Sequence, residues 1–364
     1  MKHAQIFGIL EQVAPPAYQE SYDNAGIITG SYDTECTGAI ITLDVTEAVV
    51  QEALSHKANL IIAHHPLIFN PLKKIIPGNA VTNPLIEAIK HDITIYAIHT
   101  NLDNVATGVN HKLCSVLGIK NPEILAPGNG KLSKLVTFVP PSHANKVREA
   151  LFAAGAGDIG NYDLCSFNSQ GEGTFRAKKN THPFSGKIGE MHSGPEVRIE
   201  TIFPAYLSQK ITKALKTTHP YEEVAYDICS IDNYHPAVGA GMIGDLDHPI
   251  SWRNFLDTVK EKLHIPCIRH TGITDHKVKR VAVCGGAGSF LITKARKANA
   301  DLFLTGDIKY HEFFDGGKQL ILADIGHYES EQFTKDLLFE ILNEKFPTFA
   351  LSISKTNTNP VKYL

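Results

Sequence analysis

The feature that most constrains this chain is that part of its sequence is repeated. At a constant shift of 64 residues, Phe138-Val139-Pro140 aligns with Ile202-Phe203-Pro204, and Tyr162-Asp163-Leu164-Cys165-Ser166 aligns with Tyr226-Asp227-Ile228-Cys229-Ser230. Each copy has the pattern of an apolar strand, a proline turn, an amphipathic helix and a second strand. Two such units in tandem predict a ferredoxin-like α+β domain. The segment 171–194, rich in Gly, Ser, Lys and His, is expected to add a hairpin and a loop.

A second, weaker repeat relates the two flanks of this domain at a shift of 242 residues. Ile40-Ile41 aligns with Ala282-Val283, and Ala58-Asn59-Leu60-Ile61-Ile62 aligns with Ala300-Asp301-Leu302-Phe303-Leu304. Both copies predict strand, helix and strand, followed by another continuously apolar strand, as in a parallel sheet buried on both faces. The fold class is therefore α/β, with two related α/β halves that form a discontinuous core around an inserted ferredoxin-like α+β domain. Turn-rich segments divide the chain into a first half at 1–128, an insertion at 129–236 and a second half at 237–364.

The composition limits the classes of partner and of metal ligand that the chain can have. The 364 residues carry 35 Lys and Arg against 38 Asp and Glu, so the formal charge of −3 indicates neither a nucleic-acid nor an anionic-membrane partner. Eighteen His stand beside six Cys, and the cysteines form no Cys-x-x-Cys pair, which directs metal chemistry toward imidazole and carboxylate ligands. No apolar stretch approaches the ~18–20 residues of a membrane span, and no signal-peptide core is recognisable, so a cytoplasmic protein is expected.

Metal-ligand side chains follow three predicted strands. In an open parallel α/β sheet, ligands bind beyond the carboxyl ends of the strands. His64-His65 follows the first of these strands, the segment from His99 to Asp103 follows the next, and the segment from Asp324 to Glu331 follows a strand of the second half. Because successive residues of an extended segment point to opposite sides, the two adjacent histidines suit two neighbouring ions better than one.

The third segment brings two donors to one face of a helix. His327 and Glu331 stand four residues apart where a helix predicted over 329–345 begins, so both can project from the same side. Five candidate ligands are too few for two isolated metal sites. They suffice if one carboxylate bridges two ions and water fills the remaining positions.

Several motifs together resemble a known family. They are Leu43-Asp44-Val45-Thr46-Glu47-Ala48-Val49-Val50, Ala63-His64-His65-Pro66-Leu67, His99-Thr100-Asn101-Leu102-Asp103, Thr305-Gly306-Asp307 and Gly326-His327-Tyr328-Glu329-Ser330-Glu331. They resemble the NGG-interacting-factor-three-like proteins, often labelled GTP cyclohydrolase 1 type 2 homologues. Ser21-Tyr22-Asp23-Asn24 is similar to a family motif that usually has Trp at the aromatic position. The resemblance extends to the insertion, where the segment 219–226 is similar to the PII-like and CutA-like domain of the longer bacterial members.

The resemblance implies a site for two divalent metal ions. Carried over residue by residue, His65 and Asp103 hold one ion, His64 and His327 hold the other, and Glu331 bridges both. Mixed imidazole and carboxylate ligation admits Zn, Mn, Fe, Co or Ni, and the order of affinities does not choose among them. The resemblance also implies a toroidal homohexamer, built from trimers, whose metal sites face an internal cavity.

A glycine-rich segment is a weaker candidate for phosphate binding. Gly285-Gly286-Ala287-Gly288-Ser289 lies between a predicted strand and a helix, where backbone N–H groups can cradle phosphate. It lacks the third glycine of a dinucleotide fingerprint and the lysine of a P-loop. A tight turn is therefore favoured over a phosphate site, whose residues would be Gly286, Gly288 and Ser289.

Four other polar residues have alternative roles. Asp307 either holds a ligating histidine or caps the helix that follows it. Asp44 is expected to cap the next helix. For His219 and Glu222 in the insertion, a folded turn with a solvated carboxylate is favoured over a metal pair.

The leading functional hypothesis is a metal-dependent hydrolase of a nucleotide or another small phosphorylated or heterocyclic compound. Its candidate catalytic residues are His99, Glu329 and Asp307, of which the first two are suited to relay protons. The rival is a metal-binding regulatory or chaperone-like protein whose inserted domain senses a small ligand. A structural assembly scaffold is a third interpretation. Serine-nucleophile hydrolysis has no support, because the sequence has no Gly-x-Ser-x-Gly elbow.

Overall fold

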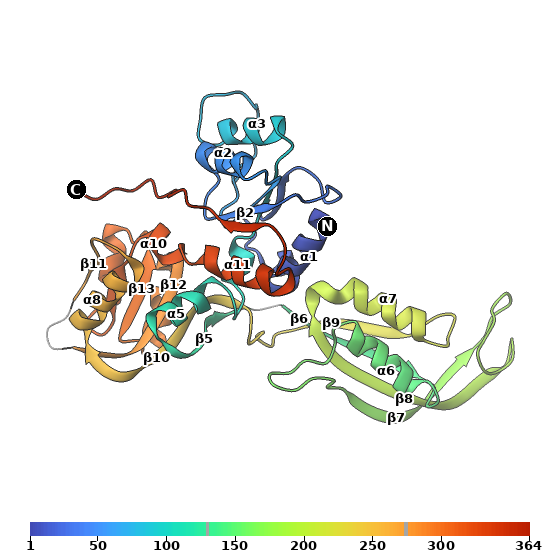
Figure 1. Ribbon diagram of the computed structural model, residues 1–364. Helices are drawn as coiled ribbons and strands as arrows, with labels where there is room; N and C mark the ends of the chain where they lie inside the picture. The colour runs from blue at the N-terminus through green and yellow to red at the C-terminus, as the bar shows by residue number, and fades with distance from the viewer. Residues whose placement is uncertain (129–130, 273–275) are drawn as a thin grey trace. The chain divides into compact units, whose positions relative to one another are not determined.

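The computed structural model describes residues 1–128, 131–272 and 276–364 (Figure 1). The chain divides into two compact units. The core unit comprises residues 1–126 and 237–364, and the inserted unit comprises residues 127–236. Asn129, where the sequence predicts the insertion to begin, lies outside the described residues.

The first sheet of the core unit has five strands in the order β1-β4-β3-β2-β15. They are β1 (Gly26–Thr29), β2 (Ala39–Thr42), β3 (Leu60–Ala63), β4 (Thr94–Ala97) and β15 (Leu351–Ile353). All neighbours are parallel except β1 and β4. Every residue of β2, β3 and β4 is buried because helices cover both faces. The covering helices are α1 (His3–Val13) and α11 (Thr334–Lys345) on the face of Ile62, and α2 (Glu47–Ser55) and α3 (Thr82–Lys90) on the face of Ile61.

The second sheet has six strands in the order β11-β14-β13-β12-β10-β5. They are β5 (Lys120–Pro127), β10 (Gly239–Ser251), β11 (Arg269–His270), β12 (Lys277–Ala287), β13 (Leu302–Gly306) and β14 (Ile321–Asp324). The central strands β12, β13 and β14 are parallel, like β2, β3 and β4 of the first sheet. The helices on its two faces are α5 (Val109–Leu117) and α8 (Trp252–Leu263) on one, and α9 (Ile292–Lys297) on the other.

The two halves of the core unit are joined by an exchange of edge strands. β5 belongs to the first half of the sequence but lies at the edge of the second sheet, beside β10. β15 belongs to the second half but pairs with β2 of the first sheet. The predicted α/β class with two related halves is confirmed, and each half builds a sheet of its own. The remaining short helices are η1 (Pro16–Tyr18), α4 (Thr100–Asp103), η3 (Ser289–Leu291), η4 (Tyr310–Gly316) and α10 (His327–Glu331).

The inserted unit is ferredoxin-like, as the 64-residue repeat predicts. Its elements are β6 (Leu132–Val139), α6 (Ala144–Ala153), β7 (Phe167–Arg176), β8 (Met191–Pro204), η2 (Ala205–Leu207), α7 (Ser208–Thr218) and β9 (Tyr226–Ile231). The antiparallel sheet has the order β7-β8-β6-β9, and α6 and α7 pack together on one of its faces (Figure 1). The expected hairpin of segment 171–194 is an extension of β7 and β8 themselves, which pair as far as Arg176 and Met191.

The helix predicted over 329–345 is interrupted. α10 ends at Glu331 and α11 begins at Thr334. The break has a physical reason, because the two segments pack on different halves. Ser330 of α10 accepts a hydrogen bond from the backbone of Gly286 in the second half, whereas Leu338 of α11 is buried against the first sheet.

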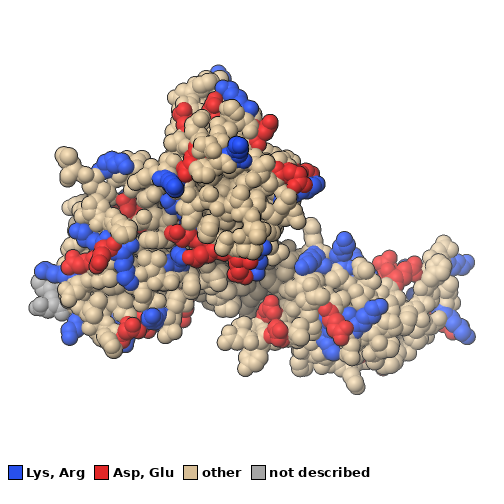
Figure 2. All heavy atoms as spheres, in the orientation of Figure 1, with Lys and Arg blue, Asp and Glu red and all other residues tan. Residues whose placement is uncertain are grey.

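The described part of the chain contains no helix with the length and apolar character needed to cross a bilayer. On the face shown in Figure 2, Lys and Arg side chains are interspersed with Asp and Glu. This mixture agrees with the near-balanced formal charge of the sequence.

Candidate metal centre

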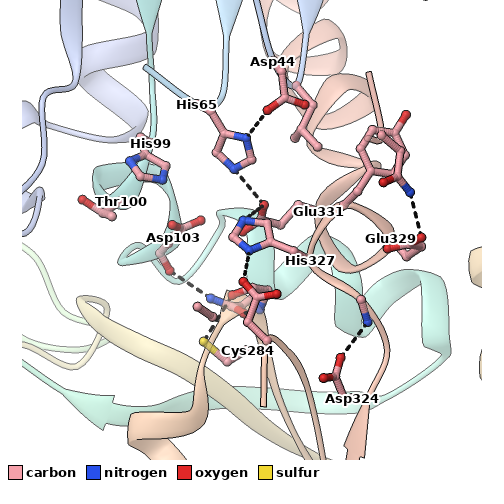
Figure 3. A pocket seen from close by; sticks show the side chains of 18 of the residues that line it. Asp44, His65, His99, Thr100, Asp103, Cys284, Asp324, His327, Glu329 and Glu331 are labelled. Atoms are coloured by element: carbon pink, nitrogen blue, oxygen red, sulfur yellow. Dashed lines mark hydrogen bonds and ion pairs between the residues drawn. The ribbon is translucent and has the colours of Figure 1, made fainter. Parts of the chain in front are cut away.

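The candidate ligands converge where the ends of two strands meet a short helix. His64 and His65 follow β3 directly, and Asp103 ends α4, the short helix after β4. His327 and Glu331 are the first and last residues of α10. Figure 3 shows His65 and His327 directed toward Glu331 from different elements. Four of these residues, all except the fully buried His64, border a cavity of about 810 Å³.

Glu331 is the centre of the arrangement. Its Oε2 lies 3.0 Å from Nε2 of His65 and 3.2 Å from Nε2 of His327. Its Oε1 lies 3.8 Å from Nε2 of His64, which in turn lies 3.6 Å from Oδ1 of Asp103. Glu331 is only 3 % exposed, and its two oxygens face different histidines, Oε1 toward His64 and Oε2 toward His65 and His327.

The two donor groups differ from the division that the family resemblance implies. Of the groups that contain Glu331, one is His64, Asp103 and Glu331, and the other is His65, His327 and Glu331; within each, the donor atoms lie within 4.8 Å of one another. The resemblance instead pairs His65 with Asp103 and His64 with His327. A third group within the same limit, His64, His65 and His99, contains both adjacent histidines, so their assignment to different ions stays a prediction.

Hydrogen bonds fix the orientation of each histidine. The Nδ1–H of His64 donates to the carbonyl of Ile98 at 2.8 Å. The Nδ1–H of His65 donates to Oδ1 of Asp44 at 2.7 Å, and that of His327 donates to Oδ2 of Asp307 at 2.7 Å. An oxygen acceptor at Nδ1 directs Nε2 toward the centre, which is how metal-ligating histidines are usually held.

Two polar atoms show that the residues fit a bound cation. Nε2 of His64 and Oδ1 of Asp103 are both buried and lack a hydrogen-bond partner among the described residues. Buried polar atoms are normally paired, because leaving one unpaired costs about 1–3 kcal/mol. A cation between these two atoms would satisfy both. The mixed imidazole and carboxylate set suits a divalent transition-metal ion.

The pKa values of the candidate ligands are shifted by burial and by their charged neighbours. Burial and the neighbouring charge of Glu331 raise the pKa of Asp103 well above its ordinary value. Burial opposes charge on His65 and His327, but their carboxylate partners outweigh it and raise the pKa of His65 to about 10 and that of His327 to about 9. Contacts with three histidines hold the pKa of Glu331 well below its ordinary value, although burial acts in the opposite direction. Metal binding to such a set displaces protons.

His99 adds a fourth imidazole at the edge of the cluster. Its ring centroid lies 5.3 Å from that of His64 and 5.4 Å from that of His65. Its Nδ1–H donates to Oδ1 of Asp23 at 2.7 Å, and the other oxygen of Asp23 accepts hydrogen bonds from Thr100. These bonds outweigh the effect of burial and lower the pKa of Asp23 to about 2. His99 is therefore held by a charged carboxylate beside the donor groups.

The other catalytic candidates have different surroundings. Asp307 orients His327 rather than capping a helix. Glu329 is buried and lines the cavity, but its Oε1 accepts a hydrogen bond from Nδ2 of Asn359, 2.8 Å away, and it belongs to neither donor group.

The glycine-rich segment does not offer its N–H groups to a phosphate. Gly286 N–H donates to Oγ of Ser330 at 2.9 Å, and Gly288 N–H donates to Oγ1 of Thr305 at 2.8 Å. Ser289 begins η3, which has only three residues. The glycine serves another purpose, because a Cβ added at Gly286 would overlap Oε1 of Glu331. The tight turn makes room for the central carboxylate.

The structure corrects the role expected for Asp44. The N-cap of α2 is Thr46, whose Oγ1 accepts a hydrogen bond from Val49 N–H at 3.3 Å. Asp44 instead holds His65. Sequence reasoning also missed Asp23 as the partner of His99, although both carboxylates belong to the motifs that carry the family resemblance.

His219 and Glu222 do not form a metal pair. Nε2 of His219 lies 3.0 Å from the carbonyl of Phe138, and Nδ1 accepts a hydrogen bond from Tyr221 N–H at 3.1 Å. Glu222 accepts a hydrogen bond from the backbone of His182. Both ring nitrogens are thus engaged within a folded turn, as the sequence analysis favoured.

Comparison with known proteins agrees with the motifs. The sequence profile of the DUF34/NIF3 (NGG1p interacting factor 3) family matches residues 1–360. The GTP cyclohydrolase 1 type 2 homolog of Bacillus subtilis is 38 % identical over 366 residues, covering 99 % of this chain and 98 % of that protein. The homolog of the same name from Halalkalibacterium halodurans is 38 % identical over 367 residues, with the same coverage. The crystal structure of a Bacillus cereus protein related to NIF3 is 40 % identical, covers 100 % of this chain and 99 % of that chain, and has a TM-score of 0.87. The chain therefore belongs to the DUF34/NIF3 family.

Proposed function

We propose that this protein is a metal-dependent hydrolase with two divalent ions per chain, acting on a nucleotide or another small phosphorylated or heterocyclic compound. The observation that carries the proposal is the Glu331 carboxylate, whose two oxygens face two separate donor groups. The cyclohydrolase name of the relatives points to hydrolysis of a heterocycle. Divalent ions held at such a centre supply Lewis acidity and an acidified water.

The residues around the metal centre have two roles, orientation of the ligands and proton transfer. Asp44 and Asp307 keep Nε2 of His65 and His327 directed toward Glu331. His99 lies outside the Glu331 groups but beside His64 and His65, and Asp23 fixes its ring. An imidazole so held is suited to accept a proton from the attacking group or to give one to the leaving group.

The cavity has room and surfaces for such a substrate. Its volume of about 810 Å³ lies within the usual range of small-molecule sites, about 300–1,000 Å³. Tyr22 and Phe69 line it with ring centroids 6.2 Å apart, and they are 61 % and 44 % exposed. The Phe69 ring centroid lies 6.3 Å from that of His99. Exposed aromatic rings suit a planar heterocycle, because such rings favour offset stacking.

The test is hydrolysis by the full chain loaded with Mn²⁺, Zn²⁺ or Co²⁺ across a panel of nucleotides and phosphoesters. We expect His64→Ala and His327→Ala to abolish turnover. His99→Asn should lower kcat by about 10²–10⁴-fold without loss of metal, because its role is proton transfer. Glu340→Gln, which alters an exposed ion pair with Lys112, is the matched control. Absence of hydrolysis across the panel, or variants that match the native chain, would contradict the proposal.

A cavity in the inserted unit favours a second candidate function, regulation by a small ligand. The cavity has a volume of about 400 Å³ and is lined by Phe175, Phe184, Tyr221 and Glu196, among others. The Tyr221 ring lies 6.0 Å from that of Phe184 and 6.4 Å from that of Phe175, and its hydroxyl donates to Glu196 at 2.7 Å. An aromatic wall with one anchored carboxylate is typical of a site for a small organic molecule.

This alternative is tested by thermal-shift screening of the full chain with nucleotides and small organic amines. A regulatory ligand should bind His64→Ala and His327→Ala as it binds the native chain, and should lose affinity for Glu196→Gln. Ligands that require His64 or His327, or that ignore Glu196→Gln, would contradict it.

A further inference from the structure

The chain after β15 runs from the first sheet to the metal centre. We call residues 354–364 the C-terminal segment. Its first residues are anchored on the first half, because Ser354 N–H donates to the carbonyl of Ile41 at 2.8 Å. The hydroxyls of Ser354 and Thr356 donate to Oε2 of Glu52 in α2, at 2.6 and 2.8 Å. The segment therefore begins in a fixed position.

Further along, the segment contacts the support of a candidate ligand. The hydroxyl of Thr358 donates to Oδ2 of Asp44 at 2.6 Å. The other oxygen of that carboxylate, Oδ1, accepts the Nδ1–H of His65 at 2.7 Å. Both oxygens of Asp44 are thus engaged, one by the segment and one by the histidine. A carboxylate held at both oxygens cannot rotate without breaking a hydrogen bond.

The next residue contacts the other half of the centre. Nδ2 of Asn359 donates to Oε1 of Glu329 at 2.8 Å, and Glu329 lies between His327 and Glu331 on α10. Asn359, Pro360, Val361 and Tyr363 also line the cavity of the centre. The C-terminal segment therefore contacts Asp44, which holds His65, and the helix that carries His327 and Glu331.

We propose that the C-terminal segment positions the metal ligands, and that Thr358 is a positioning residue that orients His65 through Asp44. The inference deepens the proposed function, since it concerns the same metal centre. Partners that orient a metal-ligating histidine affect metal affinity strongly, typically by about 10–100-fold. Thr358 is one hydrogen bond further from the metal, so its effect should be smaller.

The test compares hydroxyl and methyl groups at two positions of the segment in the full chain. Thr358→Val keeps the size of the side chain but removes its donor, and Thr358→Ser restores the donor. Thr356→Val is the matched control, because Thr356 makes the same kind of bond to Glu52, a carboxylate that is in neither donor group. The probe is Co²⁺, with affinity measured by competition against a chromogenic chelator and coordination followed by visible absorption.

We expect Thr358→Val to weaken Co²⁺ binding about three- to tenfold, the worth of one hydrogen bond, and to change the visible spectrum. Thr358→Ser should stay within about twofold of the native chain. Thr356→Val should leave both the affinity and the spectrum unchanged. Unfolding midpoints measured with chelator present establish that each variant is folded.

Two results would overturn the inference while the proposed function stands. One is a Thr358→Val chain with native affinity and spectrum, and the other is an equal loss in Thr356→Val, which would make the segment merely structural. A native chain that binds no Co²⁺ would overturn the metal centre itself and the inference with it.

Discussion

The two halves of the core unit place different side chains at matching positions. At the shift of 242 residues, Asp44 corresponds to Gly286 and His65 corresponds to Asp307. In the first half, Asp44 at the end of one strand holds His65 at the end of the next. In the second half, Asp307 holds His327, which follows a third strand. Both halves supply a carboxylate–histidine pair, but from different strand ends.

This difference shows which features the two copies of the repeat share. The repeat conserves the strand ends, which parallel sheets make available for ligands, and leaves the side chains free to differ. Gly286 occupies the position of Asp44 and has no side chain, which leaves space for Glu331. At this position one half therefore contributes the carboxylate that orients His65, and the other contributes the space that the shared carboxylate fills.

Removal of the shared carboxylate should have the largest effect, because it is the only group common to the His64–Asp103 and His65–His327 donor groups in the described chain. We expect Glu331→Gln to lower metal affinity by more than about 100-fold, beyond the loss typical of an outer partner. Isothermal titration with Co²⁺ and elemental analysis of the purified chain measure the affinity and the number of ions.

The control for Glu331→Gln is Glu340→Gln on α11, which changes an exposed carboxylate and should bind metal as the native chain does. A Glu331→Gln chain that retains both ions at native affinity would show that the two donor groups do not depend on a shared ligand.

The two carboxylates that orient histidines, Asp44 and Asp307, should differ in their effect on metal affinity. Asp44 is 35 % exposed and bonded at both oxygens, whereas Asp307 is 55 % exposed. We expect Asp44→Asn to lower Co²⁺ affinity toward the upper part of the range of about 10–100-fold, and Asp307→Asn toward its lower part. Asparagine tolerates the left-handed backbone at position 307, where φ is +55°. Competition titrations measure both, and a larger loss in Asp307→Asn would reverse the comparison.

Much of the site was predictable because its ligands lie next to locally patterned elements. The buried strands β3 and β4 are recognisable from apolar runs, so the donors His64, His65 and Asp103 could be placed at one edge of a sheet. The helical spacing of His327 and Glu331 was equally visible. The division of the donors between the oxygens of Glu331 depends on side-chain directions, which sequence spacing does not determine.

The parts that sequence could not provide depend on distant contacts. Thr358 bonds to Asp44 across 314 residues, and nothing in the local pattern around Thr358 signals that contact. The break before α11 likewise arises because α10 and α11 pack on different halves.

The homohexamer stays a prediction, which light scattering would support at about 240 kDa, six times the 39.9 kDa of one chain.

The smallest of these effects concerns Gly286, which corresponds to Asp44 in the first half. Its φ is +62°, and that of the exposed Gly317 is +63°, so alanine should strain the backbone at both positions, by about 1–3 kcal/mol. Only at position 286 would the added methyl group meet Glu331; at 317 nothing lies within 4 Å. We therefore expect both variants to lose unfolding free energy in urea, but a loss of Co²⁺ affinity, roughly tenfold or less, in Gly286→Ala alone. Equal metal affinity in the two variants would mean that the space at Gly286 does not set the position of the shared carboxylate.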